Sequence, residues 1–319
     1  MKYTESNMTE LKESYSPSEG KTMMTFDQLP SANQNLSFVQ LSSQFKKELN
    51  IDELSTAVFK TLGFYTDNHF NQGAALLSDK GFIEHAYIDI AKFRLDTSYF
   101  QNRITYANQS ILSQFENAVH FIHDYYLEIE VIEGAKRIRR EVIPFVALRE
   151  ALANAIIHRD YLIQSGIQIA LFDNRIEIMS PGGLPDGMTE DLYYQELTSL
   201  SRNPVISYVF YRLGYIERFG TGVKRIIDSY RAYKIKPTFI LKETQIKMIL
   251  PVIEYDYKSL KEKEAIIAYL SAFPKSSRAM IEATLGLEKA TAVRKINALI
   301  EEGDLLKIGE GPAVVYQIN

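Results

Sequence analysis

The chain has 319 residues, of which 46% are hydrophobic and 24% are charged, and its formal net charge is −4. This composition excludes a mainly disordered or fibrous chain, and the length is typical of two domains. The absence of cysteine excludes a disulfide framework and thiolate-bound metals. The negative charge excludes a globally basic nucleic-acid coat, so any contact with DNA requires a local basic surface.

The hydropathy of the chain predicts no membrane partner, and the absence of cysteine fits a cytoplasmic protein. No apolar stretch approaches the roughly 18 residues that cross a bilayer, and the start of the chain is polar rather than signal-like. Residues 1–24 contain few apolar side chains, so they predict a flexible arm.

Residues 25–256 alternate between helical and strand patterns and predict an α/β (α+β) domain. Helical spacing of apolar residues appears over 38–62 with a break at Asn50, over 108–126, over 145–161, and in a stretch that ends near Tyr230. Strand patterns cover 84–95, two strands within 127–142, a hairpin over 167–180 with its turn at Asp173–Asn174, and 245–253.

Residues 257–319 have a different pattern. Three short helices are expected over 262–273, 277–285 and 288–303, followed by a hairpin over 305–318. Three helices and a terminal hairpin are typical of a winged helix-turn-helix, so we expect a second, smaller domain here.

One predicted helix carries a polar stripe. Glu150, Asn154 and His158 are spaced at i, i+4 and i+8, so they share one helix face, while the residues between them are mostly apolar. Buried carboxylate and amide groups are costly unless they are satisfied, so the stripe predicts a cavity or a ligand. The alternative is an amphipathic helix whose polar edge faces solvent.

Three segments that contain this helix resemble one family. They are REALANAIIHRDY (149–161), FDNRIEIMSPGGLPDGM (172–188) and SRNPVISYVFYRLGYIERFGTGVKRI (201–226). In order and spacing they resemble bacterial regulators with a divergent Bergerat-type (GHKL) ATP-binding domain, which are often labelled helicase-related. The resemblance implies a two-layer Bergerat-like sandwich with ATP and Mg²⁺ as cofactors. Helicase activity is excluded because the chain has no P-loop or second translocase motif.

The resemblance also implies roles for single residues. Glu150 stands where the family's glutamate activates the attacking water, and Asn154 stands where an asparagine ligates Mg²⁺. His158 follows on the same helix and is expected to contact the nucleotide. Ser180 replaces the aspartate that reads adenine in relatives, in the loop that also contains Gly182 and Gly183.

Gly220, Thr221 and Gly222 resemble the second glycine box, in which small residues let backbone N–H groups approach phosphate. Taken alone, this tripeptide also fits a helix start with glycine for packing. Because divergent members of the family often lack turnover, we expect nucleotide binding without turnover.

The N-terminal TESNMTELKES resembles the opening of a Schlafen/Alba-type DNA-binding domain, but the central part of that domain is absent from the sequence. We therefore interpret residues 1–24 as a remnant and assign them no DNA contact. The basic run at 136–140 predicts either a phosphate contact or, more simply, the exposed face of a hairpin.

DNA contact is expected in the C-terminal domain. Lys289, Arg294 and Lys295 lie on the predicted recognition helix, and Arg278 and Lys307 flank it. From residue 258 onward there are nine Lys and Arg against eight Asp and Glu, so the basic excess is small. The alternative is a winged helix used for dimerisation or protein contact.

The sequence therefore predicts a nucleotide-responsive, DNA-binding transcriptional regulator. By analogy with both modules, we expect a homodimer. Two alternatives stay open: an Mg²⁺-dependent ATPase in a nucleic-acid or defence complex, and an interaction scaffold that binds no nucleotide.

Overall fold

The computed structural model describes residues 24–94, 100–126, 129–133, 136–185, 187–195, 201–217, 221–253 and 255–319. The predicted N-terminal arm, apart from its last residue, and Gly220 lie outside the described residues. Among the helices that are described, none is long and apolar enough to cross a membrane.

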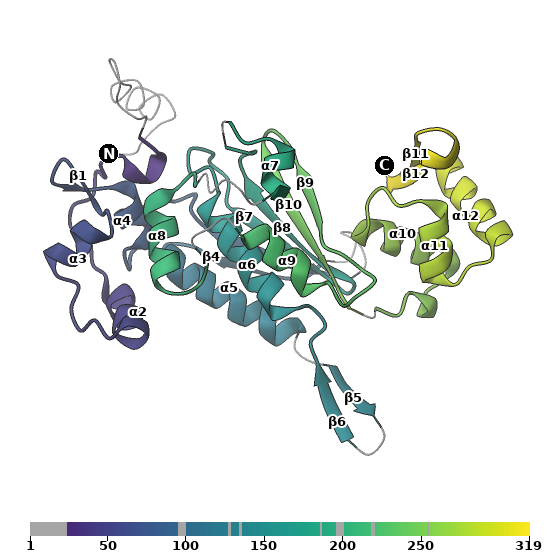
Figure 1. The fold of residues 1–319 in the computed structure, drawn as a ribbon, viewed down its shortest axis with the longest axis horizontal. Coiled ribbons are helices and arrows are strands. Elements are labelled where there is room, and N and C mark those ends of the chain that lie inside the picture. Colours follow the sequence, from purple (N-terminus) through teal and green to yellow (C-terminus); the bar gives the residue numbers. More distant parts are fainter. Residues whose placement is uncertain are drawn as a thin grey trace.

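A six-stranded mixed sheet lies at the centre of the molecule (Figure 1). Its order is β4-β3-β7-β8-β10-β9, in which β3 and β7 run parallel and every other neighbouring pair runs antiparallel. The strands are β3 (Ile88–Phe93), β4 (Phe100–Tyr106), β7 (Ile167–Phe172), β8 (Arg175–Pro181), β9 (Thr238–Leu241) and β10 (Gln245–Pro251). Along β7, Ile167, Ile169 and Leu171 are buried while Gln168 is exposed, which is the alternation expected when one face of a sheet is covered. The predicted mixed α+β class is confirmed.

Two helices, α5 (Ile111–Tyr126) and α6 (Phe145–Ile157), pack against the sheet, and α9 (Gly222–Ser229) packs against α6. The predicted helical stretch up to Tyr230 is divided into three described helices, α7 (Glu190–Gln195), α8 (Pro204–Arg212) and α9. Pro204 begins α8, and Gly214 follows the end of α8 in the left-handed region with φ of 73°. These two residues are the sequence signals of the break.

The N-terminal lobe contains η1 (Phe26–Gln28), α2 (Val39–Leu49), α3 (Thr56–Thr61), β1 (Tyr65–Thr66), β2 (His69–Phe70) and α4 (Gln72–Leu77). The predicted break at Asn50 is confirmed, since Asn50 ends α2 in the left-handed conformation. Buried side chains of this lobe belong to the same hydrophobic cluster as those of the sheet.

Asp27 connects this lobe to α8. Its side chain is fully buried, and its Oδ2 accepts hydrogen bonds from the backbone nitrogens of Val205 (2.7 Å) and Ile206 (3.1 Å). Thr25 donates its hydroxyl to Oδ1 at 2.6 Å. Burial nevertheless outweighs these hydrogen bonds and raises the pKa of Asp27 from 3.8 to about 6.

We predict that replacing Asp27 by asparagine removes a pH-dependent cost of folding. Between about pH 4 and pH 6 the folded protein retains a proton that the unfolded chain has released, so stability falls as the pH rises through this window. The full effect is about 3 kcal/mol at most. Urea unfolding of the wild type and the Asp27→Asn variant, at several pH values from 4 to 7, measures this effect as the difference between their free energies of unfolding. A difference that does not vary with pH would contradict the prediction.

A two-stranded hairpin, β5 (Ile129–Glu133) and β6 (Lys136–Arg140), projects from the body of the molecule (Figure 1). The two strands predicted within 127–142 are therefore confirmed. The side chains of the basic run 136–140 lie outside the described part of the structure.

The C-terminal residues form three helices and a hairpin around a second hydrophobic cluster. The elements are η2 (Tyr257–Ser259), α10 (Glu262–Ala272), α11 (Arg278–Leu285), α12 (Lys289–Glu301), β11 (Leu305–Ile308) and β12 (Val315–Ile318). The cluster contains Ile266, Ile281, Ile296 and Leu305, one from each of α10, α11, α12 and β11. These elements lie where the sequence predicted them.

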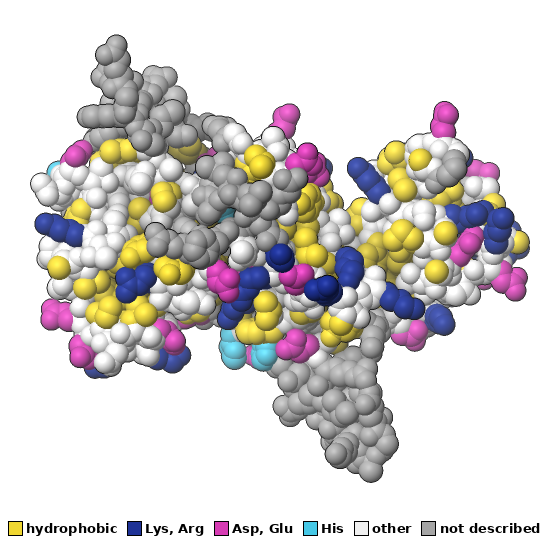
Figure 2. Space-filling view, viewed as in Figure 1, with side chains coloured by type: hydrophobic (Ala, Val, Ile, Leu, Met, Phe, Trp, Pro, Cys, Tyr) yellow, Lys and Arg dark blue, Asp and Glu magenta, His cyan; other side chains and the backbone are white. Residues whose placement is uncertain are grey.

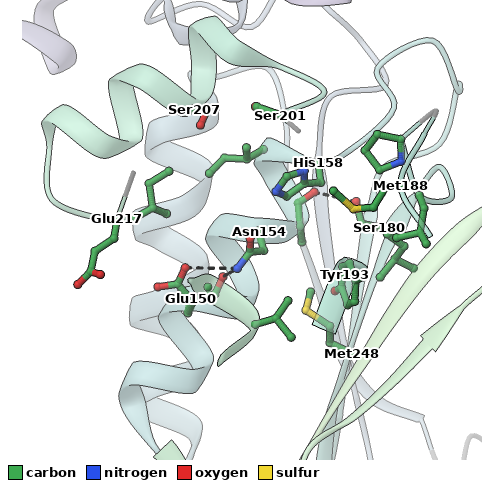
Figure 3. Close-up of a pocket in the computed structure, with 18 of the residues that line it drawn as sticks. Glu150, Asn154, His158, Ser180, Met188, Tyr193, Ser201, Ser207, Glu217 and Met248 are labelled. Atoms are coloured by element: carbon green, nitrogen blue, oxygen red, sulfur yellow. Dashed lines mark hydrogen bonds between the residues drawn. The ribbon is translucent and has the colours of Figure 1, made fainter. Parts of the chain in front are cut away.

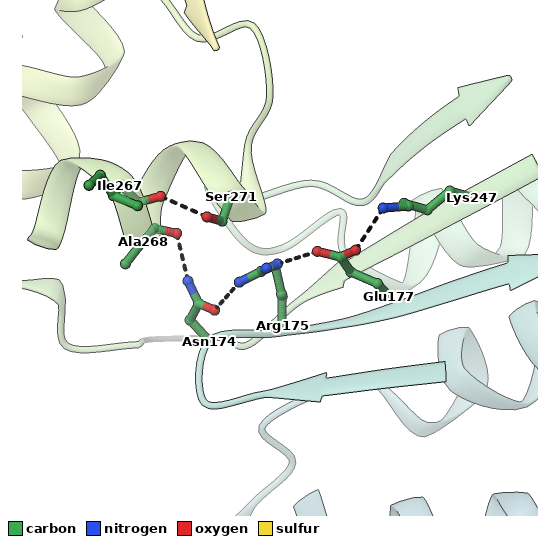
Figure 4. Close-up of polar contacts among 7 residues, drawn as sticks. All are labelled: Asn174, Arg175, Glu177, Lys247, Ile267, Ala268 and Ser271. Carbon is green, nitrogen blue, oxygen red and sulfur yellow. Dashed lines mark hydrogen bonds and ion pairs between the residues drawn. The ribbon is translucent and has the colours of Figure 1, made fainter. Parts of the chain in front are cut away.

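A buried polar contact connects the sheet to this C-terminal unit (Figure 4). Asn174, in the turn between β7 and β8, is fully buried and donates to the carbonyl oxygen of Ala268 in α10 at 2.6 Å. Its Oδ1 accepts from Arg175 at 2.9 Å, and Arg175 also pairs with Glu177 at 2.7 Å. Lys247 on β10 holds the other oxygen of Glu177 at 2.9 Å. The predicted Asp173–Asn174 turn is therefore confirmed and also attaches α10 to the sheet.

Candidate functional site

A cavity of about 390 Å³ lies between α6, α7, α8, α9 and the sheet strands β8 and β10 (Figure 3). This volume is within the range of small-molecule sites. Of the residues predicted to bind nucleotide, the cavity is lined by Glu150, Asn154, His158, Ser180 and Gly222. The predicted polar stripe of α6 therefore faces a cavity rather than solvent.

Glu150 is the most deeply buried charged group of the cavity, with 2% of the residue exposed. Asn154 donates to both its backbone oxygen (2.9 Å) and its Oε1 (3.3 Å). Oε2 is also buried, and none of the described residues donates a hydrogen bond to it. Burial raises the pKa of Glu150, and the nearby positive charges of Arg225 and Arg149 oppose that rise. A carboxylate in this state is suited to accept a proton from a ligand or a water molecule.

Two charged residues near Glu150 were not predicted from the sequence. The Nη1 of Arg225 lies 3.8 Å from Oε2 of Glu150 and 2.9 Å from Oε1 of Glu217. Thr221 donates its hydroxyl to the other oxygen of Glu217 at 3.3 Å. Arg225 follows Gly222 by three residues, so helical spacing from the glycine box is the signal that places it on the same side of α9.

Gly222 is required by a close approach of two helices. A Cβ atom at this position would lie 2.6 Å from Oε1 of Glu150 and 2.6 Å from Nδ2 of Asn154. The start of α9 therefore lies directly on the Glu150–Asn154 pair. None of the described side chains caps α9, and Gly222 and Val223 at its start line the cavity. Free backbone N–H groups at a helix start favour an anion such as phosphate.

His158 and Ser180 also line the cavity and lie away from Glu150 (Figure 3). Burial, assisted by the positive charge of Arg202, lowers the pKa of His158 to about 4, so the ring is neutral near pH 7. Ser180 is buried and donates its hydroxyl to the carbonyl oxygen of Ala155 at 2.7 Å. Its oxygen therefore presents lone pairs to the cavity, as an acceptor for an amino group.

The wall of the cavity near His158 and Ser180 is otherwise mainly apolar. The flat ring of a nucleotide base would fit against such a wall. The side chains that form it are Leu184, Pro185, Met188, Leu192, Tyr193, Ile246 and Met248.

The structure does not bring Gly182, Gly183 and Thr221 to the lining of the cavity. A Cβ at Gly182 would lie 2.3 Å from Nη1 of Arg202, and one at Gly183 would lie 2.4 Å from the carbonyl oxygen of Glu243. These two glycines therefore allow the loop after β8 to pack closely on its neighbours. Thr221 is the residue before the first turn of α9, and its hydroxyl donates a hydrogen bond to Glu217 rather than facing the cavity.

The residues present fit a nucleotide with magnesium. The carboxamide nitrogen of Asn154 donates hydrogen bonds to Glu150. The carboxamide oxygen of Asn154 could therefore serve as a ligand for a hard cation. Among the described residues, no group of three or more His, Asp or Glu forms a metal site. Magnesium commonly takes one or two protein ligands and several phosphate and water oxygens, so a single amide ligand suffices.

The five predicted DNA contacts lie on the C-terminal unit but differ in their surroundings. Lys295 pairs with Glu262 at 2.8 Å, and Arg278 pairs with Glu282 at 3.1 Å. The three that are exposed are Lys289, Arg294 and Lys307.

Comparisons with known proteins agree with an ATPase-like domain. An ATPase-like family model described as "Putative ATP-dependent DNA helicase recG C-terminal" matches residues 164–250, which include Ser180 and Gly222 but not Glu150 and Asn154. None of the curated proteins matches the chain.

A crystal structure of the DIP2311 protein from Corynebacterium diphtheriae is similar in fold, with a TM-score of 0.59 and 16% sequence identity. The similarity covers 92% of this chain and 70% of that one. Residues 164–250 of this chain thus resemble a divergent ATP-binding domain.

Proposed function

We propose that this protein is a nucleotide-responsive DNA-binding regulator. The observation that carries the nucleotide part is the close approach of Gly222 to Glu150 and Asn154. It puts the start of α9, which none of the described side chains caps, beside a buried carboxylate and an amide whose nitrogen already donates to Glu150. The phosphates would lie at the start of α9, and the base would lie against the apolar wall with Ser180 and His158 at its polar edge. Magnesium, when bound, would neutralise the phosphates beside Asn154.

The DNA part of the proposal assigns a winged helix to the C-terminal unit. Besides the three helices and the hairpin, Ser276 and Tyr316 form an isolated antiparallel bridge, with N···O distances of 3.1 and 2.9 Å, which ties the segment before α11 to the hairpin. In this proposal α12 enters the major groove and presents Lys289 and Arg294, and a homodimer reads two half-sites. Lys295 and Arg278 already have acidic partners, so their contribution to DNA affinity is smaller.

The response to nucleotide would arise as a shift between two arrangements that differ in DNA affinity. The test measures the affinity for duplex DNA and the melting temperature across titrations with ATP and with ADP, each with Mg²⁺. We expect nucleotide to raise the melting temperature and to change the DNA affinity. The proposal fails if both nucleotides leave both quantities unchanged.

A second candidate function is an Mg²⁺-dependent ATPase. It is favoured by the buried Oε2 of Glu150, which accepts no hydrogen bond from the described residues and is close to where a terminal phosphate would lie. Phosphate release by the wild-type protein, compared with a Glu150 variant, separates the two functions.

A further inference from the structure

The surface of α9 and the loop that follows it is strongly basic, in contrast to the chain as a whole. Residues 222–236 contain five Lys and Arg against one Asp, whereas the complete chain has a net charge of −4. Figure 2 shows dark blue Lys and Arg side chains over α9 and toward the lower edge of the C-terminal helices. We call residues 222–236 the α9 surface.

The α9 surface has an inner and an outer side. Val223 and Ile226 are buried, and Gly222 lies on Glu150, so the inner side is held against the cavity. On the outer side, Lys224 and Asp228 are exposed on the helix itself. One helix therefore contacts the candidate nucleotide site and solvent at the same time.

The loop after α9 presents three cations and an aromatic ring at the surface. Arg231, Tyr233, Lys234 and Lys236 are all exposed. Lys236 donates to the carbonyl oxygens of Tyr230 at 2.8 Å and Arg231 at 3.2 Å, which holds the loop in a compact turn. The ring of Tyr233 lies edge-on to that of buried Tyr230, 6.4 Å between centroids. The cations are therefore displayed on a fixed loop.

We propose that the α9 surface binds the phosphate backbone of DNA and adds to the contacts of the C-terminal unit. The positive charge of the α9 surface is complementary to a polyanion, since Lys and Arg supply most protein contacts to DNA phosphates. Such contacts fix the position of the protein on the duplex and do not distinguish one base sequence from another. Two further cations, Lys258 and Lys261 at the start of the C-terminal unit, are also exposed. The choice of DNA as the polyanion rests on the proposed function.

This placement gives the nucleotide response a physical route. Phosphate at the start of α9 and DNA phosphate on its outer side would bind the same short helix. Any movement of α9 caused by a ligand in the cavity then changes the position of DNA contacts directly, without passing through the C-terminal unit.

The test uses the double variant Arg231→Gln/Lys234→Gln of the full chain and a fluorescently labelled duplex of mixed sequence. Anisotropy titrations at several salt concentrations give the slope of log K against log salt. If both side chains contact phosphates, the slope becomes less steep by about 1.8, because each contact contributes about 0.9. The matched control is Lys47→Gln/Lys60→Gln, which removes the same charge from exposed positions on α2 and α3. The control should bind like the wild type.

Two further arms separate the inference from the proposed function. If Lys289→Gln/Arg294→Gln weakens binding while Arg231→Gln/Lys234→Gln binds like the wild type, the inference is overturned and the winged-helix proposal stands. The reverse result supports the inference and removes α12 as the DNA contact. Vesicles with phosphatidylserine form the last arm, and binding to them that depends on Arg231 and Lys234, with duplex binding unaffected, would overturn the inference in favour of a membrane surface.

Discussion

Replacing Gly222 by alanine is expected to abolish high-affinity nucleotide binding, with a loss of about 100-fold or more. The added Cβ would lie 2.6 Å from both Oε1 of Glu150 and Nδ2 of Asn154. The side-chain ends of Glu150 and Asn154 must therefore shift, or α9 must move away from α6, and either change disturbs the pair proposed to lie beside the phosphates. We expect this to cost about 1–3 kcal/mol of stability. Isothermal titration and urea unfolding measure the two effects.

The matched control for this prediction is Gly303→Ala in the C-terminal unit. Apart from its chain neighbours, none of the described residues has an atom within 4 Å of the added Cβ, but φ is 84°, so alanine is strained there by about 1 kcal/mol. The control should therefore lose stability and retain nucleotide affinity. Equal nucleotide affinities of Gly222→Ala and wild type would contradict the close packing of α9 on Glu150.

Replacing Glu150 by glutamine is expected to preserve nucleotide binding while removing any phosphate release. Loss of a general base lowers turnover by about 100-fold to 10,000-fold. Folding stability should be unchanged or higher, because glutamine keeps the shape and removes a carboxylate whose pKa is raised by burial. Arg225 keeps an acidic partner, since Glu217 lies 2.9 Å away.

A phosphate-release assay and a urea unfolding curve test this prediction together. Glu243→Gln is the control, because Glu243 is exposed and does not line the cavity. Release by the Glu150→Gln protein at the wild-type rate would remove Glu150 as the base. Wild-type release at background would remove the ATPase function and leave nucleotide binding as the role of the cavity.

Much of the fold was predictable wherever the spacing of apolar residues along the chain matches a helix or a strand. The periodicity over 108–126 and 145–161 corresponds to α5 and α6, and the alternation over 167–180 corresponds to β7 and β8. Two strands of the sheet were not predicted. The edge strand β4 is mostly exposed along its length and therefore lacks an apolar alternation, and β9 has only four residues. Edge strands need no buried face, so hydrophobic patterning does not reveal them.

The candidate site was predictable in part. Glu150, Asn154 and His158 share one face by helical spacing alone, and all three line the cavity. Gly182 and Gly183 were expected to contact nucleotide, but their Cβ positions are filled by Arg202 and by the backbone at Glu243. A sequence shows that glycine is needed at a position and does not show whether a ligand or the protein itself fills the space.

By itself, the sequence determined the mixed α+β class, the positions of the long helices to within about four residues and the polar face of α6, because these depend on local spacing. Only the tertiary structure decided that α9 lies on Glu150 and Asn154, that Arg225 and Glu217 belong to the same charged group, and that a buried Asn174 attaches α10 to the sheet. Each of these contacts joins residues about 70 or more positions apart in the chain, except the Arg225–Glu217 pair. The contacts of α9 are set by its packing against α6, and the Asn174 contact by the packing of α10 on the turn between β7 and β8, neither of which a local pattern encodes.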